Sequence, residues 1–515
     1  MNPALCGLAA NPSVPPGLID RLIALADDDI AANLALRDDL SHAQAVALAS
    51  RGEECAVALG YAGRLAAADI DPVTQPDAAL ALLFESRAAN PEWARLLAVD
   101  PVVARRERLA ACPWLPPDVK ETPAADPHLD VVTELALWTT TRTAAGLAEH
   151  PHAEVRRAVA ANEATPPDVP AALLAGEGLP PAQRCLVCDL EEPPFTRDPH
   201  CLRPDCDLPA GAFCDGSHES TVHDTQLMAL RNRATPVTAA VGFVDHPSLL
   251  LRWALAARPD LPPDICARLA VDTNPGVRGD LAENPAVDDA LIRVLATDRD
   301  PDIRRRLAPN PRVPFDVLTH LAGTTRIGAT LLTRIAAASP AEAAELATSP
   351  HPATRMLLAR RRDLPPAIRD APAADSDAKV VKSSAPHPGL SEAQLDATLY
   401  RFGSQVAAGV AANPDATPAL LAKIASHEPP ARKALREIAR HRHAPASALL
   451  TCPQDVRARP IAAGHPALPP AVIEELLTDA VPEVAEAAAA NPPLAPTVMT
   501  SRPPTCTRTI SCSEW

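Results

Sequence analysis

The sequence predicts an all-α fold, an α-solenoid of two-helix repeats about 26 residues long. Three observations predict it. A short phrase returns at a fixed step, the residues around it follow the apolar pattern of two short helices, and prolines stand at the same places in each copy. A fixed period of this length indicates stacked supersecondary units, because one unit alone cannot bury its apolar face.

The returning phrase is centred on a position that is usually proline. Most neighbouring copies are 26 residues apart, and the longer gaps within the C-terminal half are close to two periods. A further copy lies at 155–163. The central positions are Pro12, Asp38, Arg233, Pro259, Pro285, Pro311, Arg362, Pro388, Pro414, Pro466 and Pro492.

Each copy contains the pattern of two short helices. Before Pro259, the residues Leu251, Leu255 and Ala256 fall on one helical face. The proline ends this helix because it has no amide donor. A second helix is expected to begin at prolines such as Pro263, where the first turn needs no N–H. Each helix is about eight residues long, too short to persist alone, so stacking is required.

The same pattern divides the chain. We expect degenerate helical repeats over 1–175, a cysteine-rich insert over 176–225, regular repeats over 226–500 and a disordered tail over 501–515. The period is hard to follow between about 43 and 145, which indicates irregular repeats, with a separate helical domain as the alternative. Residues 370–389 have the composition of a linker but keep the period, so a weak repeat is expected there.

Charge and composition favour a helical protein that neither binds nucleic acid nor spans a membrane. The 59 prolines fit regular helix punctuation, and the formal charge of −16 opposes binding to nucleic acid, whose affinity comes from neutralised phosphates. The arginine runs 304–306 and 360–362 are expected on solvated helix faces, with a local basic groove as the alternative. No apolar run reaches membrane-spanning length and no signal-type segment begins the sequence, so a cytoplasmic protein is expected.

One dense cysteine cluster interrupts the repeats. Its spacing is C-x2-C-x12-C-x4-C-x7-C-x3-H, and pairs of thiolates at such spacing converge on one metal ion. Metal binding would supply folding energy to a segment with little apolar sequence. Zinc is expected, and the candidate metal ligands are Cys185, Cys188, Cys201, Cys206, Cys214 and His218.

The first four of these residues are the favoured set, with Cys214 as a replacement for one of the second pair. His200 is a further candidate, whereas His223 is expected on the polar surface. His441 lies at a repeat junction and is expected on the surface of a turn. The cysteines that stand alone on helical stretches are expected to be buried thiols: Cys6, Cys55, Cys112, Cys266 and Cys452.

The phrase Ala-x-Asn-Pro-x-x-Pro-Pro, with Val-Arg and Leu-Ala around it, resembles the leucine-rich repeat variant, a HEAT-like α-solenoid family, most clearly from about 228 to 498. The resemblance implies units that pair an α-helix with a 3₁₀ helix in a right-handed superhelix. It also implies a cysteine-rich module with a [4Fe–4S] cluster. Here the insert lies inside the array and its ligand spacing differs.

The segment Cys214-Asp215-Gly216-Ser217-His218 resembles the CDGSH iron–sulfur signature, whose cysteine and histidine bind a [2Fe–2S] cluster. That family has a C-x-C pair upstream, where this chain has Cys201 and Cys206. An iron–sulfur cluster is therefore the alternative to zinc.

The sequence contains no Gly-rich phosphate loop, no G-x-S-x-G elbow and no H-E-x-x-H pair, so we expect a protein that is not an enzyme. The leading hypothesis is a repeat scaffold whose concave face docks a protein or peptide partner, with a metal-stabilised insert. One alternative is a redox- or metal-sensing iron–sulfur repeat protein. Another is a HEAT-like enzyme that processes nucleic acid.

Overall fold

The computed structural model describes residues 2–85, 91–112, 114–180, 182–186 and 219–501. Within these ranges the chain is helical, as predicted, and its only extended pairing is a single bridge between His152 and Arg184. No helix in the described ranges has the length and apolar character to cross a membrane. The chain forms two compact units: unit 1 contains Met1–Ala81 and Ser339–Trp515, and unit 2 contains Leu82–Ala338.

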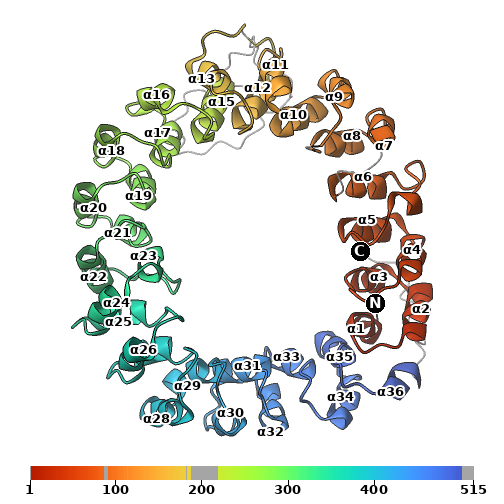
Figure 1. Cartoon of the computed structure of the whole chain (residues 1–515), viewed down its shortest axis with the longest axis vertical. Helices are drawn as coiled ribbons and strands as arrows, with labels where there is room; N and C mark the ends of the chain where they lie inside the picture. The colour runs from red at the N-terminus through yellow and green to blue at the C-terminus, as the bar shows by residue number, and fades with distance from the viewer. Residues whose placement is uncertain (1, 86–90, 113, 181, 187–218, 502–515) are drawn as a thin grey trace, which may run out of the picture. The chain divides into compact units, whose positions relative to one another are not determined.

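Unit 2 is a stack of helix pairs. Helices α15, α17, α19 and α21 pack on one another in chain order, and α18 and α20 lie beside them in a second row (Figure 1). The helices of this unit are α7 (Pro91–Leu97), α8 (Val103–Ala110), α9 (Pro117–Ala124), α10 (Leu129–Trp138), α11 (Thr141–Leu147), α12 (Ala153–Ala161), α13 (Asp168–Ala175), α15 (Glu219–Arg231), α16 (Val237–Ala240), α17 (Leu249–Ala256), α18 (Pro263–Leu269), α19 (Pro275–Glu283), α20 (Asp289–Leu295), α21 (Pro301–Leu307), α22 (Phe315–Thr324) and α23 (Thr333–Ala336).

Unit 1 is built in the same way from the two ends of the chain. Its C-terminal part stacks α25, α27, α29, α31, α33 and α35 in order, and its N-terminal part stacks α1, α3 and α5. The boundary with unit 2 falls inside α6 (Pro76–Glu85). The helices are α1 (Pro3–Ala10), α2 (Pro16–Leu25), α3 (Asp28–Ala35), α4 (His42–Ala49), α5 (Glu53–Tyr61), α24 (Pro340–Ala347), α25 (Pro352–Leu358), α26 (Pro366–Ala373), α27 (Ala378–Ser384), α28 (Glu392–Phe402), α29 (Ser404–Ala411), α30 (Pro418–Ala425), α31 (Arg432–Arg440), α32 (Ala446–Leu449), α33 (Arg459–Ala463), α34 (Pro470–Leu476), α35 (Pro482–Ala489) and α36 (Pro496–Ser501).

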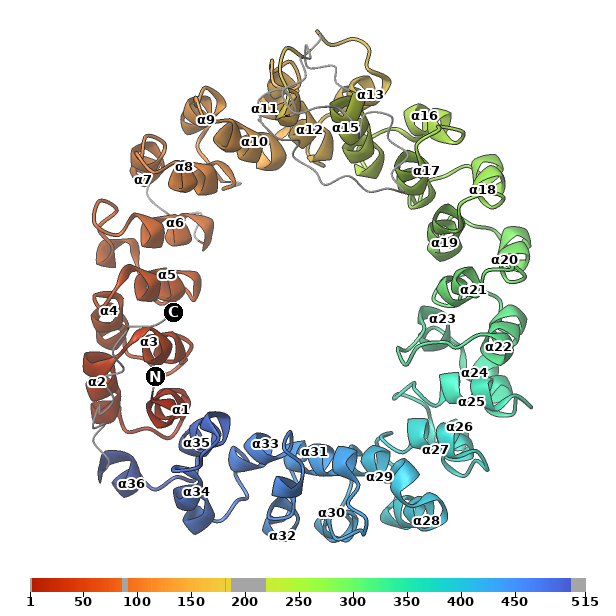
Figure 2. The same ribbon diagram turned by 180° about the vertical axis from the view of Figure 1, so that it is seen from behind.

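The two parts of unit 1 meet through its first and last repeats. Helix α1 packs directly on α35, and both views show them side by side (Figures 1 and 2). Gly7 makes the close approach possible, because a Cβ on this residue would lie 2.1 Å from the Glu486 carbonyl oxygen. The N-terminal repeats therefore continue the C-terminal stack.

The predicted repeat pattern is confirmed in its local detail. Leu251, Leu255 and Ala256 are fully buried, and α17 ends before Pro259. Pro263 stands in the first turn of α18. The weak repeat expected at 370–389 is present as the end of α26 followed by α27. The 3₁₀ helix implied by the family resemblance is not found in the pair α17 and α18, since both are α-helices.

Stacked repeats are joined by buried asparagines. We call the residue just before the usual proline the ladder position. The Asn284 amide donates to the carbonyl oxygens of Ala256 and Arg258 in the preceding repeat, both at 2.6 Å, and its side-chain oxygen accepts from Ala286 N at 2.8 Å. Short helices leave carbonyl groups without partners at their ends, and this amide satisfies two of them. The same amide bonds are made by Asn11, Asn162, Asn232, Asn310, Asn413 and Asn491.

Other donors occupy some ladder positions. Arg258 donates to the carbonyls of Leu230 and Asn232 and pairs with Asp260 at 2.8 Å. His441 Nε2 lies 2.7 Å from the Asn413 carbonyl, and His465 Nε2 lies 3.0 Å from that of His441. His441 is buried, so its expected place on a turn surface is wrong. The stacking of α31 on α29 covers it.

A second row of contacts joins the same repeats by charge. Arg278 binds both oxygens of Asp298, at 2.8 and 3.2 Å, and also donates to the Asp272 carbonyl. Asp298 in turn accepts from the backbone N–H of Asp300. The pKa of the Asp298 carboxyl is lowered, because hydrogen bonds from Arg278 and this N–H outweigh its burial. Equivalent pairs are Arg106–Asp126, Arg252–Asp272, Arg355–Asp375 and Arg436–Asp455.

Removing one ladder amide should destabilise the stack. Asn284→Ala leaves two buried carbonyls and one N–H without their partner, which we expect to lower the free energy of unfolding by about 3 kcal/mol. Urea denaturation followed by circular dichroism measures this. The control Asn33→Ala removes an amide that donates only to the exposed Asp29 carbonyl, and should change stability by less than about 0.5 kcal/mol. Equal losses in both variants would contradict the role of the ladder.

Protonation of His441 should weaken the stack. Its Nδ1 accepts from the His443 N–H at 3.1 Å, so the neutral Nε2–H form is required. Burial lowers the pKa of His441 from 6.5, helped by His443, Arg442 and His465. The unfolded chain therefore binds more protons just below pH 6.5, and stability falls as the pH drops through this value. Urea titrations between neutral and mildly acidic pH should show a smaller fall for His441→Asn than for the exposed control His443→Asn.

Candidate functional site

The cysteine-rich insert leaves the array at a firmly anchored segment. Gln183 N donates to the Pro151 carbonyl at 2.7 Å, and Ala153 N donates to that of Arg184 at 2.9 Å. Arg156 is buried and donates to the carbonyls of His150 at 2.6 Å, Pro180 at 2.5 Å and Glu149 at 3.2 Å. The guanidinium therefore ties Pro180, and the backbone bonds tie Gln183 and Arg184, to the residues at the N-terminal end of α12.

Cys185, the first predicted metal ligand, lies at the end of this anchored segment. Its side chain is fully buried. The other predicted ligands, Cys188, Cys201, Cys206, Cys214 and His218, lie outside the described residues, as does His200. The described residues contain no group of three or more histidines, cysteines or acids placed to bind a metal ion. The metal site and the choice between zinc and an iron–sulfur cluster therefore stay predictions.

The insert does not interrupt the stack. Helix α15, whose first residues (from Glu219) lie within the predicted limits of 176–225, packs directly on α12, which precedes the insert. The Asn232 amide donates to the carbonyls of Ala160 at 2.8 Å and Asn162 at 3.0 Å, 72 and 70 residues back in the sequence. The repeat made by α12 and α13 is therefore followed in space by the repeat that starts with α15.

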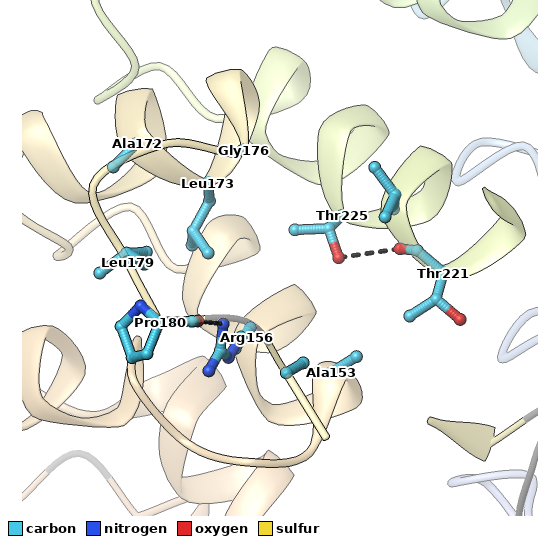
Figure 3. A pocket seen from close by; sticks show the side chains of 11 residues that line it. Ala153, Arg156, Ala172, Leu173, Gly176, Leu179, Pro180, Thr221 and Thr225 are labelled. Atoms are coloured by element: carbon cyan, nitrogen blue, oxygen red, sulfur yellow. Dashed lines mark hydrogen bonds between the residues drawn. The ribbon is translucent and has the colours of Figure 1, made fainter. Parts of the chain in front are cut away.

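A small pocket of about 190 Å³ lies at this point, between α12, α13 and α15 (Figure 3). Leu173 and Thr225 lie on opposite sides of it, and the Thr225 hydroxyl donates to the Thr221 carbonyl at 3.0 Å. Arg156 lines it too, but its guanidinium is committed to three carbonyls. The lining is therefore mostly apolar and suits an aliphatic group better than a metal ion or an anion.

His223 corrects an expectation from the sequence. It is buried, with Nε2 2.5 Å from Ser248 Oγ and Nδ1 3.6 Å from a carboxylate oxygen of Asp224. The prediction of a surface position is wrong because α15 is packed between α12 and α17, so this face of the helix meets the start of α17. Nearby, burial and the charge of His223 lower the pKa of His246.

The arginine runs agree with the prediction of a solvated face only in part, because Arg305 and Arg362 are exposed whereas the other four arginines are half-buried. Arg306 forms ion pairs with Asp280 and with Glu283, the latter at 2.6 Å, and Arg304 donates to the Asp298 carbonyl. Arg305 alone of this run is an exposed residue, paired with Asp302. In the second run, Arg361 pairs with Asp363 at 2.7 Å and Arg362 donates to the Ser383 carbonyl at 3.0 Å. Acidic groups of the array thus take up much of this charge, which weakens the alternative of a basic groove there.

Four of the five lone cysteines are buried as predicted, and the fifth is only half-buried. Cys6, Cys112, Cys266 and Cys452 are buried, and Cys55 is half-buried. Burial raises the pKa of Cys6 and of Cys452 to about 11, so neither thiol is a reactive thiolate at neutral pH.

Comparisons with known proteins add little to this geometry. No family model matches the chain, and no curated protein matches it. Among solved structures, a similar chain comes from "Structure of the Pds5-Scc1 complex and implications for cohesin function", with 10% identity and a TM-score of 0.16. The match covers 92% of this chain and 66% of that one, just under two thirds of its length. At this TM-score the likeness supports no argument about function.

The metal prediction has a direct test. Protein purified without oxygen should contain one zinc per chain by elemental analysis, and Cys185→Ser should lose it because one of four thiolate ligands is gone. Cys266→Ser removes a buried thiol in α18 and serves as the control that should keep the metal. If the analysis finds iron and sulfide instead of zinc, and the protein absorbs visible light, the insert binds an iron–sulfur cluster. Metal-free wild-type protein would contradict both assignments.

Proposed function

We propose that the protein is a non-catalytic repeat scaffold that docks a protein or peptide partner, with the cysteine-rich insert as a metal-stabilised element. The observation that carries the proposal is that the buried polar side chains bind neighbouring repeats. In the described repeats, residues such as Asn284 and Arg278 bind the neighbouring repeat instead of converging on one another. These groups fix the spacing of the stack, which is what a docking surface needs.

The form of the array also supports docking. In the described ranges each repeat packs mainly on its neighbours in the stack, which supports the α-solenoid that the proposal includes. The proposal includes the right-handed superhelix of the family resemblance and a concave face that receives the partner. Such arrays bind extended segments along their length because side chains at equivalent positions recur at each repeat.

Exposed apolar side chains point to where contact is made. Two of the five tryptophans, Trp114 and Trp138, are 48% and 55% exposed. Leu96, Val99 and Val102, in the same stretch of unit 2, are also exposed. The Trp138 indole N–H donates to the Glu134 carboxylate at 3.0 Å, which fixes the ring on the surface of α10. Tryptophan is enriched among residues that dominate binding energy, so we propose that the partner contacts these five exposed residues from α7 to α10.

Affinity capture from cell extract with chemical cross-linking tests the scaffold. Wild-type protein should recover one stoichiometric partner, and Trp114→Ala/Trp138→Ala should recover at least about tenfold less because two anchors of the contact are removed. Tyr400→Ala, which removes an aromatic ring that is 89% exposed in unit 1, is the control and should behave as wild type. No stoichiometric partner with the wild type would overturn the proposal. Equal recovery by all variants would place the contact elsewhere.

A further inference from the structure

A second pocket, of about 310 Å³, opens where α15 and α17 stack in unit 2. Its lining combines three arginines with a single acid. Arg258 occupies a ladder position, is buried, and is paired with Asp260 at 2.8 Å. Arg231 and Arg233 are exposed, and neither has a carboxylate within ion-pair distance in the part of the chain that the structure describes. The rest of the lining is Ala254, Ala257 and Pro259.

The repeat makes it possible to see what fills this place elsewhere. Two repeats further on, Arg306 of α21 reaches between Asp280 and Glu283 of α19 and forms ion pairs with both. It fills the groove so closely that a Cβ on Gly279 would lie 2.6 Å from its guanidinium nitrogen. At that junction the chain itself supplies both the guanidinium and its carboxylate partners, and the paired side chains fill the groove.

The α15–α17 junction has the same backbone positions but different side chains. Ala254 stands 52 residues before Arg306, at the equivalent position, and Arg231 stands 52 residues before Glu283. The long side chain that fills the groove is thus reduced to a methyl group, and the acid is replaced by a cation. Leu227 and Met228 stand where α19 has Gly279 and Asp280, so part of the groove is filled, but a pocket stays open beside Ala254 and Arg231. The cationic half of the pair is present there without its acid.

We propose that this pocket binds an oxyanion, a carboxylate or phosphate group carried by an acidic segment of a docked peptide. A guanidinium presents paired N–H donors that match either group, and two of them here lack an acidic partner. In a chain with a formal charge of −16, a local excess of positive charge favours an acidic ligand over a basic one. The inference rests on the proposed scaffold function, because the oxyanion belongs to the docked partner.

The probe is a short fluorescein-labelled oligoglutamate peptide, and fluorescence anisotropy with the full chain measures its binding at low salt. Arg231→Gln/Arg233→Gln should weaken binding about tenfold, since both partners of the oxyanion are removed. Ala257→Glu should weaken it as much without removing a cation, because the exposed residue 257 would carry a carboxylate into the pocket. Arg299→Gln/Arg326→Gln, two exposed arginines of unit 2 outside the pocket, is the charge-matched control. It should bind within about twofold of wild type.

Several results would overturn the inference. If Arg299→Gln/Arg326→Gln weakened peptide binding as much as the pocket variants, binding would depend only on the overall charge of the chain. Binding of oligolysine as tight as oligoglutamate, or no effect of either pocket change in variants whose circular dichroism is unchanged, would remove the site. Displacement of the peptide by inorganic phosphate at the same concentration as oligoglutamate would assign the pocket to a free anion instead. A failure of the proposed scaffold function gives a different result. The wild type would then capture no partner from cell extract, while its affinity for the oligoglutamate probe would be unchanged.

Discussion

The structure depends on one constraint: carbonyl groups at the ends of short helices become buried when repeats stack, and each needs a donor. A helix of about eight residues leaves several such groups, so an array of them would be unstable without regular side-chain donors. The ladder position supplies them, and the Asn284 amide is typical in reaching two carbonyls of the preceding repeat. The ladder donors recur near the 26-residue period because each must reach a carbonyl of the preceding repeat, as Asn310 does 26 residues after Asn284, although His441 makes the equivalent contact 28 residues after Asn413.

Much of the fold could be predicted from the sequence, because helix ends and buried faces are local properties. Leu251, Leu255 and Ala256 lie on one face of an α-helix, and α17 ends before Pro259, which could not donate a helical hydrogen bond. The role of the ladder asparagines was not predicted, since their bonds cross to another repeat. The signal was present, because asparagine recurs just before the proline, and His441 and Arg258 stand at the same place.

Less of the candidate site than of the fold could be predicted from the sequence. Cysteine spacing indicated a metal-binding insert, and Cys185 lies at its anchored edge, but spacing alone could not show that α15 would pack on α12 and bury His223. The arginine pocket could not be predicted, because it exists where the large and acidic side chains of the equivalent groove are absent. Ala254 and Ala257 are ordinary helix residues in the sequence, and they become informative only when Arg306 and Glu283 are seen to fill the equivalent groove.

The contact between α1 and α35 also has a consequence for the order of events during synthesis. Asn11 donates to the carbonyls of Ala489 and Asn491, which follow it by 478 and 480 residues in the chain. Until α35 has left the ribosome, the face of α1 that packs on it lacks this partner. Unit 1 therefore completes its stack only after translation of that helix, whereas neighbours such as α17 and α19 can pair as soon as they emerge.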